Sequence, residues 1–73
     1  MTYKEAFATV LKQLREEHNL TKTKLAQLAG LDRTSIGKME NAERSPTIET
    51  VAMLGKAFKI PGSKILERAE KLY

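Results

Sequence analysis

The feature that most constrains the fold of this chain is a glycine between two short segments whose apolar residues have the spacing of a helix. Residues 26–40 read AQLAGLDRTSIGKME. Ala26, four residues before Gly30, lets one helix approach another closely, and Gly30 can adopt the left-handed backbone conformation that ends a helix. Leu31 can then return to the core, and Asp32 is a good N-cap for a second helix. The stretch therefore predicts two short helices joined by a tight turn.

The second of these helices has one apolar face and one polar face. Ile36 and Met39 are three residues apart and point inward, which leaves Arg33, Thr34 and Lys38 on the outer face. A helix with long donors outward in its N-terminal half suits the reading of base edges in the major groove of DNA. We expect these three residues to contact bases, with guanine as the target of Arg33. The competing interpretation is that they are ordinary solvated side chains.

The rest of the chain also has helical spacing, and no long stretch alternates with period two. Thr2 and Glu5 predict a capping box for a first helix that ends near residue 18, and Thr21 and Thr47 predict caps for the second and fourth helices. Apolar stripes are expected at Phe7, Val10, Leu11 and Leu14 of the first helix and at Ile48, Val51, Leu54 and Phe58 of the fourth. In the second helix Leu25 and Leu28 are expected to face inward, and in the last helix Ile65, Leu66, Ala69 and Leu72 are expected either in the core or at a dimer interface.

This pattern predicts one compact all-α domain of five helices, spanning residues 1–73. The two helices around the glycine turn occupy about residues 21–41, and the last two helices occupy about residues 47–72. The chain is short for a stable core, since a domain of this size buries only about 60% of the surface of its unfolded chain.

Composition narrows the functional class. The net charge is +4, and the excess of basic residues begins at residue 21, where the two-helix motif begins. A positive charge favours polyanionic partners. The chain has no cysteine, a single histidine, no glycine-rich phosphate loop and no cluster of metal ligands, so we expect neither enzymatic activity nor a metal or cofactor. It also has no membrane-length apolar run, and we expect a cytoplasmic protein.

The order of these motifs resembles the lambda-repressor/Cro-like helix-turn-helix family, also called the XRE family. Residues 11–58, LKQLREEHNLTKTKLAQLAGLDRTSIGKMENAERSPTIETVAMLGKAF, follow the family's order. A basic first helix, a Leu-Thr pair, the Ala-x3-Gly turn, an Ile and a Glu in the third helix and a Pro before the fourth occur in sequence. The resemblance implies a DNA-binding domain that acts as a dimer on a two-fold symmetric operator.

Carried over by position, the resemblance places Arg33, Thr34 and Lys38 at the base-contacting positions of the family. Contacts to phosphates or to the groove are expected from residues at the starts of the second and fourth helices, in the third helix and in the loop after it, namely Thr21, Lys22, Thr23, Ser35, Asn41, Arg44, Ser45 and Thr47. Glu40 is expected to hold a nearby cation in a structural role.

Four residues depart from the family pattern. Lys22 replaces a frequent Gln, and Lys24 stands where a capping Glu is usual, so the second helix begins with cations at its positive end. Gly37 replaces a frequent Ser, which removes one expected contact. Lys59 stands where the fourth helix usually ends in a left-handed glycine, and such a conformation costs a residue with a side chain about 1 kcal/mol.

The apolar residues near the C-terminus suggest a dimer interface in addition to the DNA-binding surface. We expect a homodimer interface formed by Phe58, Ile65, Leu66 and Ala69, because a 73-residue chain has few partners to bury them internally. The function indicated is a transcriptional regulator that binds double-stranded DNA at an inverted repeat, either a restriction–modification controller or a Cro-like phage repressor. Contact with RNA polymerase is a further expected interaction. The alternative is an antitoxin or another helical protein-binding module.

Overall fold

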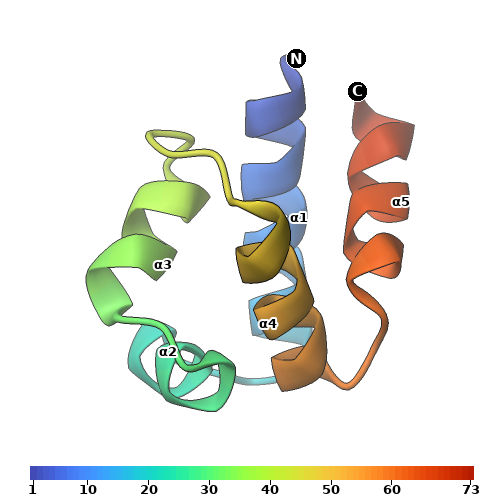
Figure 1. Ribbon diagram of the computed structural model, residues 1–73. Coiled ribbons are helices and arrows are strands. Elements are labelled where there is room, and N and C mark those ends of the chain that lie inside the picture. The colour runs from blue at the N-terminus through green and yellow to red at the C-terminus, as the bar shows by residue number, and fades with distance from the viewer.

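Five helices and the turns between them make up the molecule in the computed structural model, which describes all residues 1–73 (Figure 1). They are α1 (Tyr3–Glu17), α2 (Lys22–Ala29), α3 (Arg33–Glu40), α4 (Ile48–Phe58) and α5 (Gly62–Leu72). The all-α, five-helix prediction is confirmed. None of the helices combines the length and the apolar character that crossing a bilayer requires.

The first four helices begin where the sequence predicts, each after a residue whose side chain accepts a hydrogen bond from a free N–H group of the first turn. The hydroxyl of Thr2 accepts a hydrogen bond from the N–H of Glu5 at 3.1 Å, and the N–H of Thr2 donates to the Glu5 carboxylate at 2.7 Å, which completes the predicted capping box. Thr21 and Thr47 cap α2 and α4 through N–H groups three residues further on, at 3.0 and 3.1 Å.

A single hydrophobic core joins all five helices. The long helix α1 packs against α3 on one side and α5 on the other, and α4 packs against α2 and α5 (Figure 1). Every helix contributes at least one side chain with no exposed surface, namely Leu11, Leu25, Ile36, Leu54 and Ile65. In Figure 1, α2 and α3 lie on the opposite side of the molecule from α5. One face of the α2–α3 pair therefore packs on the core, and the other face is open to solvent.

A buried ion pair ties α1 to the end of α3. Arg15 Nε donates to Glu40 Oε2 at 2.7 Å and Arg15 Nη2 donates to Glu40 Oε1 at 3.2 Å. Arg15 Nη1 donates to the carbonyl of Leu20 at 2.9 Å. The side chains are only 13% and 3% exposed, so the pair is largely shielded from water. The predicted structural role of Glu40 is confirmed.

Side-chain hydrogen bonds lie at both ends of α1, including those that join it to α5. Arg68 of α5 binds the Glu17 carboxylate through two hydrogen bonds of 2.8 and 3.2 Å, and the Tyr3 hydroxyl donates to Glu70 at 2.9 Å. His18 forms the C-cap of α1, and its Nδ1 donates to the Leu14 carbonyl at 2.9 Å.

Four apolar side chains of the predicted stripes lie outside the core. Leu28 of α2 is 49% exposed, Ile48 of α4 is 90% exposed, and Leu66 and Leu72 of α5 are 36% and 41% exposed. Ile48 is the first residue of its helix, so it projects beyond the core although it has the spacing of the buried face. Helical periodicity predicts the direction of a side chain but not where the neighbouring helix ends.

The expected dimer residues are mostly internal. Phe58, Ile65 and Ala69 are at most 2% exposed, because α5 folds back against α1 and α4 and covers them within one chain. The premise that a chain of this length cannot bury them is wrong, and these three side chains are not available on the surface. Leu66, the fourth residue of the expected interface, is 36% exposed.

The corner between α4 and α5 is tight. Lys59 ends α4 with φ +62°, so the predicted left-handed conformation is present at a residue with a side chain. A Cβ placed on Gly55 would lie 2.7 Å from the backbone N of Gly62 and from the carbonyl oxygen of Ile60. Only glycine at position 55 allows the two helices to meet this closely.

Candidate nucleic-acid interface

The turn between α2 and α3 has the geometry that the sequence predicts. Gly30 adopts φ +73° and ψ +30°, in the left-handed region. The N–H of Leu31 donates to the carbonyl of Ala26 at 2.9 Å, and the Leu31 side chain packs against the core. Ala26 is 3% exposed, as its small size at a helix contact requires. The turn therefore fixes the angle between α2 and α3.

Asp32 starts α3. Its Oδ1 accepts a hydrogen bond from the N–H of Ser35 at 2.7 Å. This bond is the largest cause that holds the pKa of Asp32 below its ordinary value, and the positive charges of Arg44 and Lys38 act in the same direction. The carboxylate is therefore favoured in its ionised form, which is the form that caps the helix most strongly.

The outer face of α3 carries unpaired donors. Ile36 and Met39 are at most 1% exposed and anchor the helix in the core, as predicted. Arg33, Thr34 and Lys38 are exposed, and none of them forms an ion pair with another side chain. The guanidinium and the ammonium group are therefore free to bind an external acceptor.

The loop after α3 folds back onto the start of that helix. Arg44 Nη1 donates to Ser35 Oγ at 3.1 Å, which brings together two of the predicted contact residues. Ser35 therefore positions Arg44 beside the outer face of α3, a link that sequence spacing did not indicate. Asn41 is exposed at the C-cap of α3. Ala42 follows it with φ +58° and is, with Asn19 and Lys59, one of three non-glycine residues in the left-handed region.

The N-terminal ends of α2 and α4 supply the remaining candidate contacts. Thr21, Thr23, Ser45 and Thr47 are exposed, and Lys22 is half-buried. The first turn of α2 contains no acidic residue, so its positive dipole end and the side chains of Lys22 and Lys24 add to one another. Helix ends of this kind bind anions such as phosphates through their free N–H groups.

Comparison with known proteins agrees with this geometry. A family model described as "Helix-turn-helix" matches residues 11–65. The control protein C.SmaI of Serratia marcescens is 38% identical over 68 residues, which cover 93% of this chain and 81% of that protein. The chain belongs to this helix-turn-helix family.

Two further relatives show the range of the family. The transcriptional repressor RghR of Bacillus subtilis is 36% identical over 66 residues, and the match covers 89% of this chain but 49% of RghR. The crystal structure of the restriction–modification controller protein C.AhdI from Aeromonas hydrophila superposes with a TM-score of 0.82 at 29% identity, covering 85% of this chain and 94% of C.AhdI. These relatives are regulators and controller proteins, so the family is one of DNA-binding regulators and not of enzymes.

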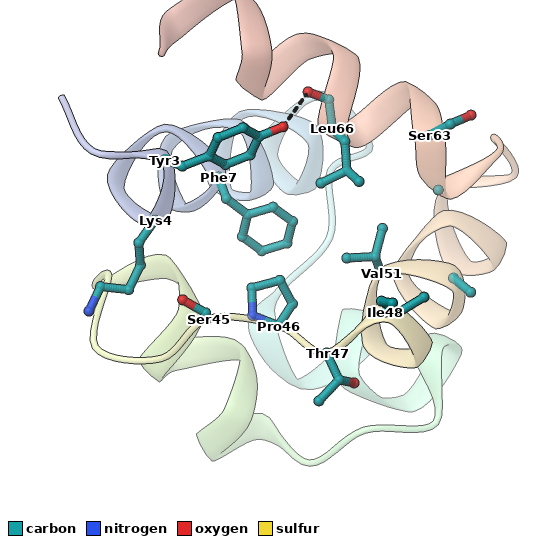
Figure 2. Close-up of a pocket in the computed structure, with 12 residues that line it drawn as sticks. Tyr3, Lys4, Phe7, Ser45, Pro46, Thr47, Ile48, Val51, Ser63 and Leu66 are labelled. Atoms are coloured by element: carbon teal, nitrogen blue, oxygen red, sulfur yellow. Dashed lines mark hydrogen bonds between the residues drawn. The ribbon is translucent and has the colours of Figure 1, made fainter.

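This helix-turn-helix protein has one further surface feature, an apolar hollow of about 540 Å³ between α1, α4 and α5 (Figure 2). The side chains of Tyr3, Phe7, Pro46, Val51 and Leu66 lie around it, and the exposed Ile48 stands at its edge. Of the expected dimer residues only Leu66 lies here.

Sequence reasoning missed the part that Ile48 plays in this surface. The available signal was its position directly after the N-cap, in the first turn of α4, where side chains extend past the packed core.

Proposed function

We propose that this chain is a sequence-specific regulator of transcription that binds double-stranded DNA with α3 in the major groove. The observation that carries the proposal is the exposed, unpaired set of Arg33, Thr34 and Lys38 on the outer face of a helix that a left-handed glycine turn joins to α2. Arginine can donate two parallel hydrogen bonds to O6 and N7 of guanine, which discriminates against other bases by about 1–3 kcal/mol. The similarity to C.SmaI and C.AhdI favours a restriction–modification controller, with a Cro-like repressor as the other subtype.

Contacts to the DNA backbone would hold α3 in register. Thr21, Lys22 and Thr23 at the start of α2 and Ser45 and Thr47 before α4 offer hydroxyl and backbone donors at two helix ends. Ser35, Asn41 and Arg44 would add contacts at the edge of the groove, with Arg44 held in place by Ser35. Lys22 and Arg44 bring positive charge, so binding should weaken as the salt concentration rises.

We infer that the protein acts as a homodimer on an inverted repeat. A two-fold interface uses the same patch on both copies, so that patch must be complementary to itself, and a projection beside a hollow on one face meets this condition. Ile48, which is 90% exposed, stands at the edge of the apolar hollow that Leu66 and Val51 help to line. Ile48 of each copy would enter the hollow of the other, and the two α3 helices would then read half-sites about one turn of DNA apart.

The proposed site of action is the cytoplasm, where occupancy of an operator would block or assist RNA polymerase. Of the acidic residues near α3, Glu43 is exposed and unpaired and is therefore our candidate for a polymerase contact. Glu40 is excluded from this role because it is 3% exposed and bound to Arg15.

The direct test is selection of bound sequences from a randomised duplex library at about 150 mM salt, where weak electrostatic binding is suppressed. We expect enrichment of an inverted repeat containing a guanine whose selection is lost in Arg33→Ala. Lys71→Ala, which removes an exposed, unpaired cation from α5, is the matched control and should select the same repeat as the unchanged protein. A folded protein that enriches no sequence would contradict the proposal and favour a protein-binding module.

A further inference from the structure

At three of the four glycine positions, the backbone conformation or the packing within the chain explains why the residue is glycine. Gly30 adopts φ +73°, which residues with a Cβ rarely do. A Cβ on Gly55 would lie 2.7 Å from the backbone N of Gly62, and a Cβ on Gly62 would lie 3.1 Å from the backbone oxygen of Val51. At these positions a larger residue would either strain the backbone or force two helices apart.

Gly37 is different because a Cβ placed on it meets no atom within 4 Å. It lies inside α3 and has no left-handed backbone that would require glycine. Glycine in a helix interior destabilises the helix relative to alanine, since it adds conformational entropy to the unfolded chain. Nothing within the chain compensates for this loss of stability.

The position of Gly37 indicates where the compensation lies. It follows Arg33 by four residues and Thr34 by three, so it shares their face of the helix. Lys38 and Asn41 continue the exposed surface on the C-terminal side. Gly37 is therefore a gap in the side-chain layer, in the middle of the surface that carries the candidate base contacts.

We propose that Gly37 is a specificity-determining residue, at which the α3 backbone approaches the floor of the major groove and contacts the methyl group of a thymine. This inference rests on the proposed function. Without a Cβ the helix can approach a base pair more closely, and its Cα presents an apolar group of the kind that recognises the thymine 5-methyl. The family resemblance led us to expect that glycine in place of the frequent Ser removes one DNA contact. In this proposal the glycine instead allows a different contact, between the α3 backbone and a base.

The test compares stability and binding in Gly37→Ala and Gly37→Ser. We expect Gly37→Ala to raise the Tm by about 2–8 °C, because alanine favours the helix. The same variant should bind the selected operator about 10-fold more weakly, a loss comparable to one mismatched base pair. Binding to a scrambled duplex of equal length should not change, since phosphate contacts do not depend on this position. Thr9→Ala, which removes a β-branched residue from the interior of α1, controls for an effect of helix stability alone.

Replacing single operator thymines by uracil removes one methyl group at a time and identifies the partner of Gly37. The unchanged protein should lose affinity several-fold at one thymine per half-site, and Gly37→Ala should show no such loss there. Undiminished operator binding by Gly37→Ala would overturn the inference while the proposed function stands. If Gly37→Ala binds the operator more weakly but uracil substitution does not change the affinity of the unchanged protein, the close approach is to the sugar–phosphate backbone. That result would overturn the thymine contact. An unchanged protein that binds no operator would overturn both proposals.

Discussion

The Arg15 guanidinium holds both carboxylate oxygens of Glu40, at 2.7 and 3.2 Å, and thereby joins the last residue of α3 to the last turn of α1. Glu40 is almost fully buried, and its charge strengthens the protonated form of Arg15, whose pKa is raised chiefly by this hydrogen bond. The pair fixes the helix that carries the candidate base contacts against the longest helix of the domain. Its removal should therefore affect both the stability of the fold and the position of α3.

We predict that Glu40→Ala lowers the free energy of unfolding by about 3–5 kcal/mol, because it leaves the Arg15 charge largely buried without a partner. Chemical denaturation followed by circular dichroism measures the loss. The double variant Arg15→Met with Glu40→Leu should recover much of it, since apolar side chains of similar volume can replace a buried pair. Arg68→Ala is the control, because its pair with Glu17 is 36% and 55% exposed and should contribute far less. A Glu40→Ala variant no less stable than this control would contradict the prediction.

The second prediction concerns pH. The hydrogen bond from the Ser35 N–H holds the pKa of Asp32 below its ordinary value of 3.8, so the folded state binds a proton less readily than the unfolded chain does. The stabilisation from Asp32 is therefore fully present above the ordinary value and is lost as the pH falls through the lower, folded value. Glu5, whose pKa is lowered by the Thr2 N–H, contributes with the same sign.

The check compares the unchanged protein with Asp32→Asn by denaturation at a series of pH values. Asparagine caps a helix without a charge, so the variant removes the titration and retains the cap. The difference in the free energy of unfolding should be constant near neutral pH and should shrink as the pH falls below about 4. If this difference stays constant down to about pH 3, protonation of Asp32 does not change the free energy of unfolding, and the prediction is wrong.

Local rules account for most of what the sequence predicted correctly. The caps at Thr2, Thr21 and Thr47 and the left-handed Gly30 each depend on a few neighbouring residues, so the sequence contains all that they require. The left-handed Lys59 was likewise predicted, from its place at the end of a helix that the family usually closes with glycine.

The features that escaped prediction depend on how distant elements meet. Ala42 adopts a left-handed conformation although alanine does not favour it, in the loop whose Arg44 binds Ser35 of α3. Ile48 follows the buried periodicity of its helix but extends past the end of the core, whereas Ile65 is buried by the return of α5 against α1. Such outcomes require the relative placement of helices, which hydrophobic spacing within one segment does not contain.

The third prediction concerns the hydrogen bond between Ser35 and Arg44, 3.1 Å long. If Arg44 binds a phosphate, Arg44→Ala should weaken DNA binding for all sequences alike and should reduce the slope of log affinity against log salt by about 1. Ser35→Ala should weaken binding less and leave that slope unchanged, because the charge remains and only its positioning is lost. Fluorescence anisotropy with a labelled duplex between about 50 and 200 mM salt gives both quantities. An unchanged slope in Arg44→Ala would remove Arg44 from the phosphate contacts.

The last prediction tests the assembly surface. Ile48 is 90% exposed within one chain, so Ile48→Asp should leave the fold and its thermal stability nearly unchanged. In a dimer formed through the hollow beside Leu66, the same change would place a charge in an apolar contact on both copies and should convert the protein to a monomer. Sedimentation velocity over a range of concentrations measures the shift. Leu28→Asp, at a 49% exposed position on α2, is the matched control and should sediment as the unchanged protein does. Dimers that persist in Ile48→Asp but dissociate in Leu28→Asp would place the interface at α2.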